Sequence, residues 1–287
     1  MSVRLVTAAL AGILLALPAF AQAPAGGTLK KVAETKTLLL GHLAESVPFS
    51  FSDSTGQPAG YSVDLCKRVA AGIQQQLNLP TLEVKWVPIT LANRFEMINA
   101  GKVDLECATS TNTISRQKIV DFSLMTWVDG GGFMTPGPVA AKSVADLSGK
   151  KVGVVKDTTT DRALRDAIAR AAVRVEVVNA PSHFDGMRMM AEGKIDAYAA
   201  DQTVLIGLAV AAGDKFVVRI AENGFSYEPY GFSMRRNDAD FKQAVNRVLA
   251  QLYRTGEIGP IYERWFGKLG KPGPLLAAMY TLNALPE

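Results

Sequence analysis

Residues 104–116 bring hydroxyl side chains and an arginine close together, and both kinds of group can bind an anion. Thr109, Ser110 and Thr111 follow a short apolar run. We expect their hydroxyls and backbone N–H groups at the start of a short helix, where the helix dipole favours a negative charge. Arg116 could then hold a carboxylate through two hydrogen bonds. The segment predicts a site for a small carboxylate, although a helix cap followed by a surface arginine would have the same sequence.

The elements around this segment alternate between strands and helices, which is typical of an α/β fold. In the first half, the predicted strands are 37–41, 82–87 and 103–107, and the predicted helices are 63–77 and 91–100. After a glycine- and proline-rich break at 129–138, the predicted strands are 150–155, 173–178, 195–200 and 232–235, and the predicted helices are 160–170, 183–192, 239–255 and 258–266. This alternation predicts mostly parallel sheets with a ligand crevice at the carboxyl ends of the strands.

The two halves of the chain share a similar link between a helix and a strand. The segment 98–104 (Ile-Asn-Ala-Gly-Lys-Val-Asp) corresponds to 190–196 (Met-Ala-Glu-Gly-Lys-Ile-Asp), with a glycine where each helix stops. Polar residues follow both strands, with Thr109 to Thr111 after one and Asp201 after the other. Two lobes that face each other across a cleft would use both sets, although such links are common enough to arise by coincidence.

The length, charge and first residues of the chain limit its class and destination. The 287 residues carry 31 basic and 27 acidic side chains without a basic block, so nucleic acid is a poor candidate partner. Arg4, the apolar run 5–17 and Ala19-Phe20-Ala21 resemble an export signal. We expect cleavage after Ala21 and a periplasmic mature protein. A retained membrane anchor is the alternative, but the apolar run is short for a membrane span.

Cys66 and Cys107 are the two cysteines of the chain, and an exported protein can hold them as a disulfide. Cys66 lies on a predicted helix and Cys107 at the end of a predicted strand, so a bridge would join a helix to a sheet. It would close a loop of about 40 residues and contribute on the order of 4 kcal/mol to stability. The alternative is two buried thiols.

Short motifs spread over nearly the whole mature chain resemble the bacterial periplasmic proteins that bind polar amino acids for ABC transporters, known as solute-binding protein family 3. Among these, the glutamate/aspartate binders are the most similar. The motifs are Gly41-His42, Val47-Pro-Phe-Ser50, Gly60-Tyr-Ser-Val-Asp64, Pro88-Ile-Thr90, Asn93-Arg94, Glu106-Cys107, Thr111-Asn112, Arg116-Gln-Lys118, Phe122-Ser123 and Trp265-Phe266. The resemblance implies two α/β lobes joined by two crossover strands that act as a hinge. It implies a signal peptide at 1–21, a first lobe built from 22–127 and 230–287, and a second lobe at 128–229.

The resemblance also implies how an amino acid would be held. Arg116, Thr109 and Thr111 correspond to the groups that bind the α-carboxylate, together with Thr159 of the second lobe. Asp201 corresponds to the acceptor for the α-ammonium group. A strand-end aspartate can also simply cap the helix that follows it.

The side-chain pocket departs from the pattern of the most similar relatives. Leu43 stands where glutamate/aspartate binders have arginine, and Leu91 stands where they have serine. Arg94 and His183 match the groups that contact the distal carboxylate, with His183 possible as a cation. Losing a charge-assisted hydrogen bond commonly costs roughly 1.5–3 kcal/mol, so we expect an altered preference for a polar or partly apolar amino acid. Surface roles for Arg94 and His183 are the alternatives.

Two other functions are compatible with this scaffold. Periplasmic cyclohexadienyl dehydratases resemble the family, and Glu45, Asp157 and His183 are the nearby candidates for their general acid. A sensor that signals through lobe closure is the other. We expect neither an enzyme nor a cofactor or metal site, since phosphate-binding, dinucleotide-binding and zinc motifs are absent from the sequence. We expect a monomer whose partners are a free amino acid and the permease subunits at the membrane.

Overall fold

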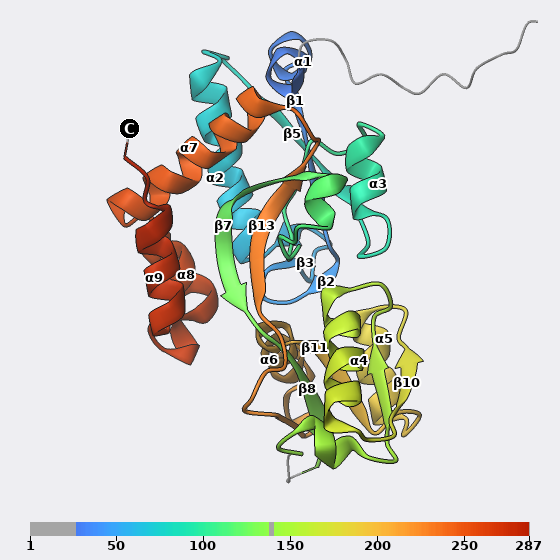
Figure 1. The fold of residues 1–287 in the computed structure, drawn as a ribbon. Coiled ribbons are helices and arrows are strands. Elements are labelled where there is room, and N and C mark those ends of the chain that lie inside the picture. Colours follow the sequence, from blue (N-terminus) through green and yellow to red (C-terminus); the bar gives the residue numbers. More distant parts are fainter. Residues whose placement is uncertain (1–26, 138–140, 287) are drawn as a thin grey trace, which may run out of the picture.

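Two five-stranded sheets form two lobes, which lie one above the other in Figure 1. The computed structural model describes residues 27–137 and 141–286, so the predicted export signal lies outside the described residues. The first sheet has the order β5 (Glu83–Pro88), β1 (Thr37–His42), β6 (Leu105–Glu106), β13 (Glu228–Met234) and β7 (Asp121–Asp129). The second has the order β10 (Glu176–Asn179), β9 (Lys151–Val154), β11 (Ala197–Asp201), β8 (Gly131–Pro136) and β12 (Val218–Ile220). The expected two-lobed α/β fold is confirmed.

Helices cover both sheets, and each buries one apolar stripe. The helices of the first lobe are α1 (Gly27–Thr35), α2 (Tyr61–Gln76), α3 (Arg94–Asn99), α7 (Ala239–Thr255), α8 (Ile258–Phe266) and α9 (Pro274–Asn283). Those of the second are α4 (Thr159–Ala171), α5 (His183–Ala191) and α6 (Gln202–Ala212). In α7, Phe241, Val245, Leu249 and Leu252 are buried at spacings of four, four and three, which places them on one face of the helix.

Two strands carry the chain between the lobes. β7 leads through Gly130 into β8, and β13 returns to the first sheet after β12. Their meeting point is the pair Glu228 and Asp129 in antiparallel register. The boundaries predicted at 127/128 and 229/230 fall inside these two strands.

An aromatic cluster packs where β7 meets α8. The rings of Trp127 and Phe266 stack with their centroids 4.3 Å apart, and Phe49 lies 5.2 Å from Trp127 and 5.5 Å from Tyr230. These rings are almost fully buried. Such pairs add to the stabilisation by apolar burial, so the base of the crossover strand is held firmly in the first lobe.

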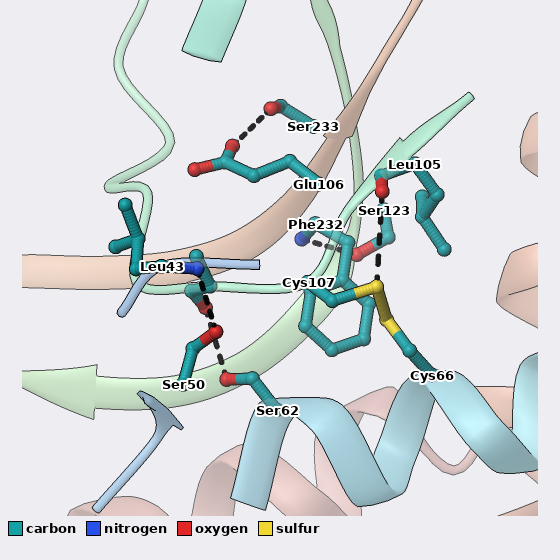
Figure 2. Close-up of a disulfide and its surroundings, with 11 residues drawn as sticks. Leu43, Ser50, Ser62, Cys66, Leu105, Glu106, Cys107, Ser123, Phe232 and Ser233 are labelled. Atoms are coloured by element: carbon teal, nitrogen blue, oxygen red, sulfur yellow. Dashed lines mark hydrogen bonds between the residues drawn. A yellow bond between two sulfur atoms is a disulfide. The ribbon is translucent and has the colours of Figure 1, made fainter. Parts of the chain in front are cut away.

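A disulfide joins Cys66 of α2 to Cys107, the residue after β6, with a Cα–Cα distance of 6.1 Å. Figure 2 shows it between the helix and the strand, as the sequence led us to expect. Ser62, one turn before Cys66, donates its hydroxyl to the carbonyl of Ala108, 2.9 Å away. Both links anchor the N-terminal turns of α2 to the segment that follows β6. This segment contains the threonines of the predicted site.

The predicted helix start after Thr111 is wrong. Residues 109–113 form no helix, Thr111 forms a β-bridge with Tyr230, and a single 3₁₀ turn η1 follows at Arg116–Lys118. The predicted helix 91–100 is also shorter, because 91–93 form a turn before α3, and the strand predicted at 173–178 is found at 176–179. The local sequence in these segments is compatible with more than one conformation, and contacts with distant segments decide which one forms.

Candidate functional site

A cavity between the lobes lies at the carboxyl ends of β6, β9 and β11. Its volume is about 30 Å³. Eight of the nine predicted ligand residues line it, namely Leu91, Arg94, Thr109, Thr111, Arg116, Thr159, His183 and Asp201. Side chains far apart in sequence and in separate lobes therefore share one enclosed space.

Arg116 is the cation of the first lobe that is most available to a ligand. Its Nη1 donates to the carbonyl of Thr111, 2.9 Å away. The other N–H groups of the guanidinium remain for a ligand. Thr113 holds the backbone of the arginine, with its hydroxyl 3.1 Å from the Arg116 nitrogen. Burial, with nearby Arg94, lowers the pKa of Arg116 to about 10, so the guanidinium is charged at neutral pH.

Arg94 is buried at the start of α3, and acidic and aromatic neighbours partly satisfy it. Its Nε donates to Ser110 Oγ at 2.8 Å and lies 3.6 Å from Glu106 Oε1. The guanidinium carbon lies 4.5 Å from the centre of the Phe95 ring, and that of Arg116 lies 5.4 Å from the same ring. Glu106 therefore offsets the charge of Arg94, whereas Arg116 faces the cavity without such a close counter-ion among the described residues.

Asp201 ends β11 and supplies the acidic group from the second lobe. Its two oxygens accept hydrogen bonds from Thr160 Oγ1 and from the Tyr230 hydroxyl, each at 2.5 Å. Burial, together with the charges of Glu228 and Asp129, raises the pKa of Asp201 to about 7. In the part of the chain that the structure describes, no cation forms an ion pair with this carboxylate, so a ligand cation would be a favourable partner.

Further hydrogen bonds join the lobes at and beside the cavity, in addition to the one from Tyr230 to Asp201. Thr111 Oγ1 lies 3.2 Å from Thr159 Oγ1, and it donates to Glu228 Oε2 at 2.6 Å. Nearby, the Phe184 N–H of α5 donates to Glu45 Oε2 of the first lobe at 3.1 Å. The structure is therefore closed around the cavity.

The helix start that faces the cavity belongs to α4. Thr158 caps this helix by accepting from the Asp161 N–H at 3.0 Å, and Thr159 and Thr160 are its first residues. Both line the cavity, where their backbone N–H groups lie at the positive end of a helix of 13 residues. A carboxylate between Arg116 and this helix start would meet positive charge from both lobes.

His183 lines the cavity as a neutral group. Its Nδ1 lies 2.8 Å from the Tyr198 hydroxyl, and burial lowers the pKa of the imidazole to about 4. The possible charged role for His183 is therefore not supported near neutral pH. Tyr198 has no other hydrogen-bond partner among the described residues, so we assign its hydroxyl as the donor and His183 Nδ1 as the acceptor. The imidazole proton then lies on Nε2, which is left as a donor.

Leu43 lies outside this cavity, in an adjoining one of about 240 Å³. The backbone N–H of Leu43 is not available to a ligand, because it donates to Ser50 Oγ at 3.0 Å (Figure 2). Leu91, Val155 and His183 line both cavities, so the two spaces share a wall. Leu43 therefore can contact only the part of a ligand that extends beyond the first cavity.

Sequence reasoning missed two residues close to Asp201: Tyr230, which donates a hydrogen bond to it, and Glu228, whose charge raises its pKa. Tyr230 and Glu228 belong to the segment 227–231, which the sequence marked only as a turn-rich stretch before a strand. Phe95, which lies beneath both arginines, was also missed. The glutamate and two tyrosines in 227–231 were a usable signal, since such residues at a crossover strand would lie close to both lobes. Over residues 27–137 and 141–286, no cluster suited to a metal ion and no helix able to cross a membrane is found.

Comparison with known proteins identifies the family and the fold of the chain. Residues 38–268 match the bacterial extracellular solute-binding proteins, family 3. The L-glutamate/L-aspartate-binding protein of Pseudomonas aeruginosa is 34% identical over 91% of this chain and 87% of its own length. The glutamate/aspartate import solute-binding protein of Salmonella typhimurium is 34% identical over 84% and 80% of the two chains. An ancestral arginine-binding protein bound to glutamine superposes with a TM-score of 0.72 at 28% identity, covering 81% of this chain and 98% of its own.

Proposed function

Because this chain belongs to the bacterial extracellular solute-binding proteins of family 3, we propose that it binds a free α-amino acid between its lobes and delivers it to the permease subunits of an ABC transporter. The observation that carries the proposal is the placement of Arg116 and Asp201, from separate lobes, on one cavity. A zwitterion needs a cation and an acid on opposite sides, and these two residues supply them.

The α-carboxylate lies against Arg116, with Thr109 and Thr111 beside it and the start of α4 at Thr159 opposite. The α-ammonium group lies against Asp201. Its arrival stabilises the ionised carboxylate, whose charge burial otherwise disfavours. Since the cavity holds only about 30 Å³, the lobes have to part to admit the ligand and close again around it. A ligand that contacts both lobes favours the closed state by its differential affinity for that state.

Calorimetric titration of Asp201→Asn tests this assignment. The substitution keeps the shape and removes the charge, so we expect affinity for the bound amino acid to fall by about tenfold to 150-fold, the equivalent of roughly 1.5–3 kcal/mol. Asp166→Asn, an exposed acid on α4, is the matched control and should bind normally. Unchanged affinity in Asp201→Asn would remove Asp201 from the site.

An enzyme on this scaffold is the second candidate, because an ancestral amino-acid-binding protein described as a precursor of cyclohexadienyl dehydratase superposes with a TM-score of 0.71 at 28% identity, covering 84% of this chain and 99% of its own. We favour binding over catalysis. Asp157 is exposed and lines neither cavity, and one oxygen of Glu45 is engaged by α5. Turnover of arogenate or prephenate in a spectrophotometric assay would overturn this choice.

We further propose export to the periplasm with cleavage after Ala21, and action as a monomer. The curated relatives are import solute-binding proteins, which supports an extracytoplasmic location. Amino-terminal sequencing of protein recovered from the periplasm should begin at Gln22. Sedimentation analysis should give the mass of one chain.

A further inference from the structure

We propose that the second cavity takes the side chain of the ligand, and that this side chain is long, with an apolar stem and a cationic end directed at Glu45. The inference rests on the proposed amino-acid binding at Arg116 and Asp201. It departs from the glutamate and aspartate named for two curated relatives.

The sizes of the two cavities decide where a side chain can go. The first cavity, about 30 Å³, has room for roughly two waters, since each needs about 10–15 Å³. The second, about 240 Å³, is eight times larger. Leu91, Val155 and His183 line both cavities, so a ligand whose head group lies between Arg116 and Asp201 extends its side chain past these residues.

Apolar side chains line much of the second cavity, where the methylene stem of the ligand side chain would lie. They are Leu43, Ile89, Leu91, Val155 and Pro181. Burying methylene groups against such walls is favourable by about 0.8 kcal/mol per CH₂, whereas burying an unpaired charge there is costly. The walls therefore favour a ligand with several methylene groups before its polar end.

Among the described residues, Glu45 is the only charged one that lines the second cavity. Its Oε2 accepts from the Phe184 N–H, and no described donor reaches its Oε1. Ligand carboxylates would meet a like charge here. A terminal ammonium or guanidinium would find an acceptor in Glu45, beside the apolar walls.

The cations near the head-group site do not change this balance. Arg94 lines only the first cavity and is offset by Glu106, 3.6 Å away. His183 lines both cavities, but it is neutral because burial lowers its pKa, so it does not repel a ligand cation. An acidic side chain would therefore have no free cation in the cavity that is large enough to hold it.

Calorimetry with pairs of ligands that differ in charge and little in shape tests the proposal. On the unmodified protein, arginine should bind at least tenfold more tightly than citrulline, and lysine at least tenfold more tightly than norleucine. Equal binding within each pair, or tightest binding of glutamate, would overturn the inference while leaving amino-acid binding in place. Failure of every amino acid to bind would overturn the proposed function itself.

Glu45→Gln then identifies the residue that recognises the cation. Because Glu45 also links the lobes through Phe184, the substitution can weaken all ligands together. The informative quantity is the ratio of arginine to citrulline affinity, which should fall to within about twofold of unity. Glu34→Gln, on the exposed face of α1, is the matched control and should keep the ratio. An unchanged ratio in Glu45→Gln would exclude Glu45 as the acceptor.

Discussion

At Gly207 in α6, the second lobe packs tightly against the backbone of the first. A Cβ atom built on Gly207 would lie 2.2 Å from the carbonyl oxygen of Val47, 2.6 Å from its carbon and 3.1 Å from Pro48 Cδ. Real Cβ contacts are essentially never shorter than 3.0 Å, so Gly207→Ala has to push the lobes apart by about 0.8 Å. We expect opening to separate α6 from this loop, so that the methyl group acts on the closed form alone.

The expected cost follows from the nature of the contact. Backbone atoms cannot rotate away, and forcing an extra methyl group into packed structure costs about 1–3 kcal/mol. If that cost applies only to closure, the apparent affinity for the amino acid should fall about 5- to 150-fold. Stability should not fall in parallel, since alanine is favoured over glycine inside a helix by about 1 kcal/mol.

Titration calorimetry, thermal unfolding and small-angle scattering together test this reasoning. Gly207→Ala should bind weakly, unfold at or above the normal temperature, and scatter as a more open particle in the presence of ligand. Gly259→Ala in α8 is the matched control, because a Cβ there would meet no atom within 4 Å. Normal affinity in Gly207→Ala would show that ligand binding does not require this close approach.

Three further predictions concern Asp201 and the disulfide. The pKa of Asp201 is raised to about 7 and binding needs its ionised form, so affinity should fall about tenfold per pH unit below 7 and level off above it. Asp201→Asn should lose this dependence. A flat calorimetric profile of the unmodified protein from pH 5 to 8 would contradict this prediction. Tyr230→Phe removes a hydrogen bond that lowers the same pKa, so the midpoint of the profile should move to higher pH, and a shift to lower pH would contradict the assignment. Replacing Cys66 and Cys107 by alanine opens a loop of 41 residues and should lower the free energy of unfolding in urea by about 4 kcal/mol, whereas a loss below about 1 kcal/mol would mean that the bridge contributes little.

The sequence was most informative about the residues that hold the head group. Thr109 and Asp201 follow strands in corresponding places of the two halves, and Arg116 comes soon after Thr109. The carboxyl ends of such strands face the ligand cleft in this class of fold. Their shared cavity could therefore be expected without coordinates. The roles of these residues in binding stay predictions until ligands are measured.

The sequence was less informative where distant segments decide the local structure. Thr111 has the hydroxyl and the context of a helix cap, yet pairing with Tyr230 holds it in a bridge, and the helix start at the cavity is Thr159. The charge state of His183 was also out of reach, because it depends on burial beside Tyr198, fifteen positions away. The order of neighbouring residues in the sequence carries no information about contacts between segments that lie far apart in the chain.

The second lobe leaves and rejoins the first at neighbouring positions, Asp129 and Glu228, which are paired across two adjacent strands. A replacement segment would need only two junctions, and both would lie within a few ångströms of each other. Recombination or laboratory grafting could therefore exchange the whole inserted lobe, with Asp201 and α4, while the disulfide-anchored scaffold that holds Arg116 stays unchanged. Half of the recognition surface could thus diversify in a single event.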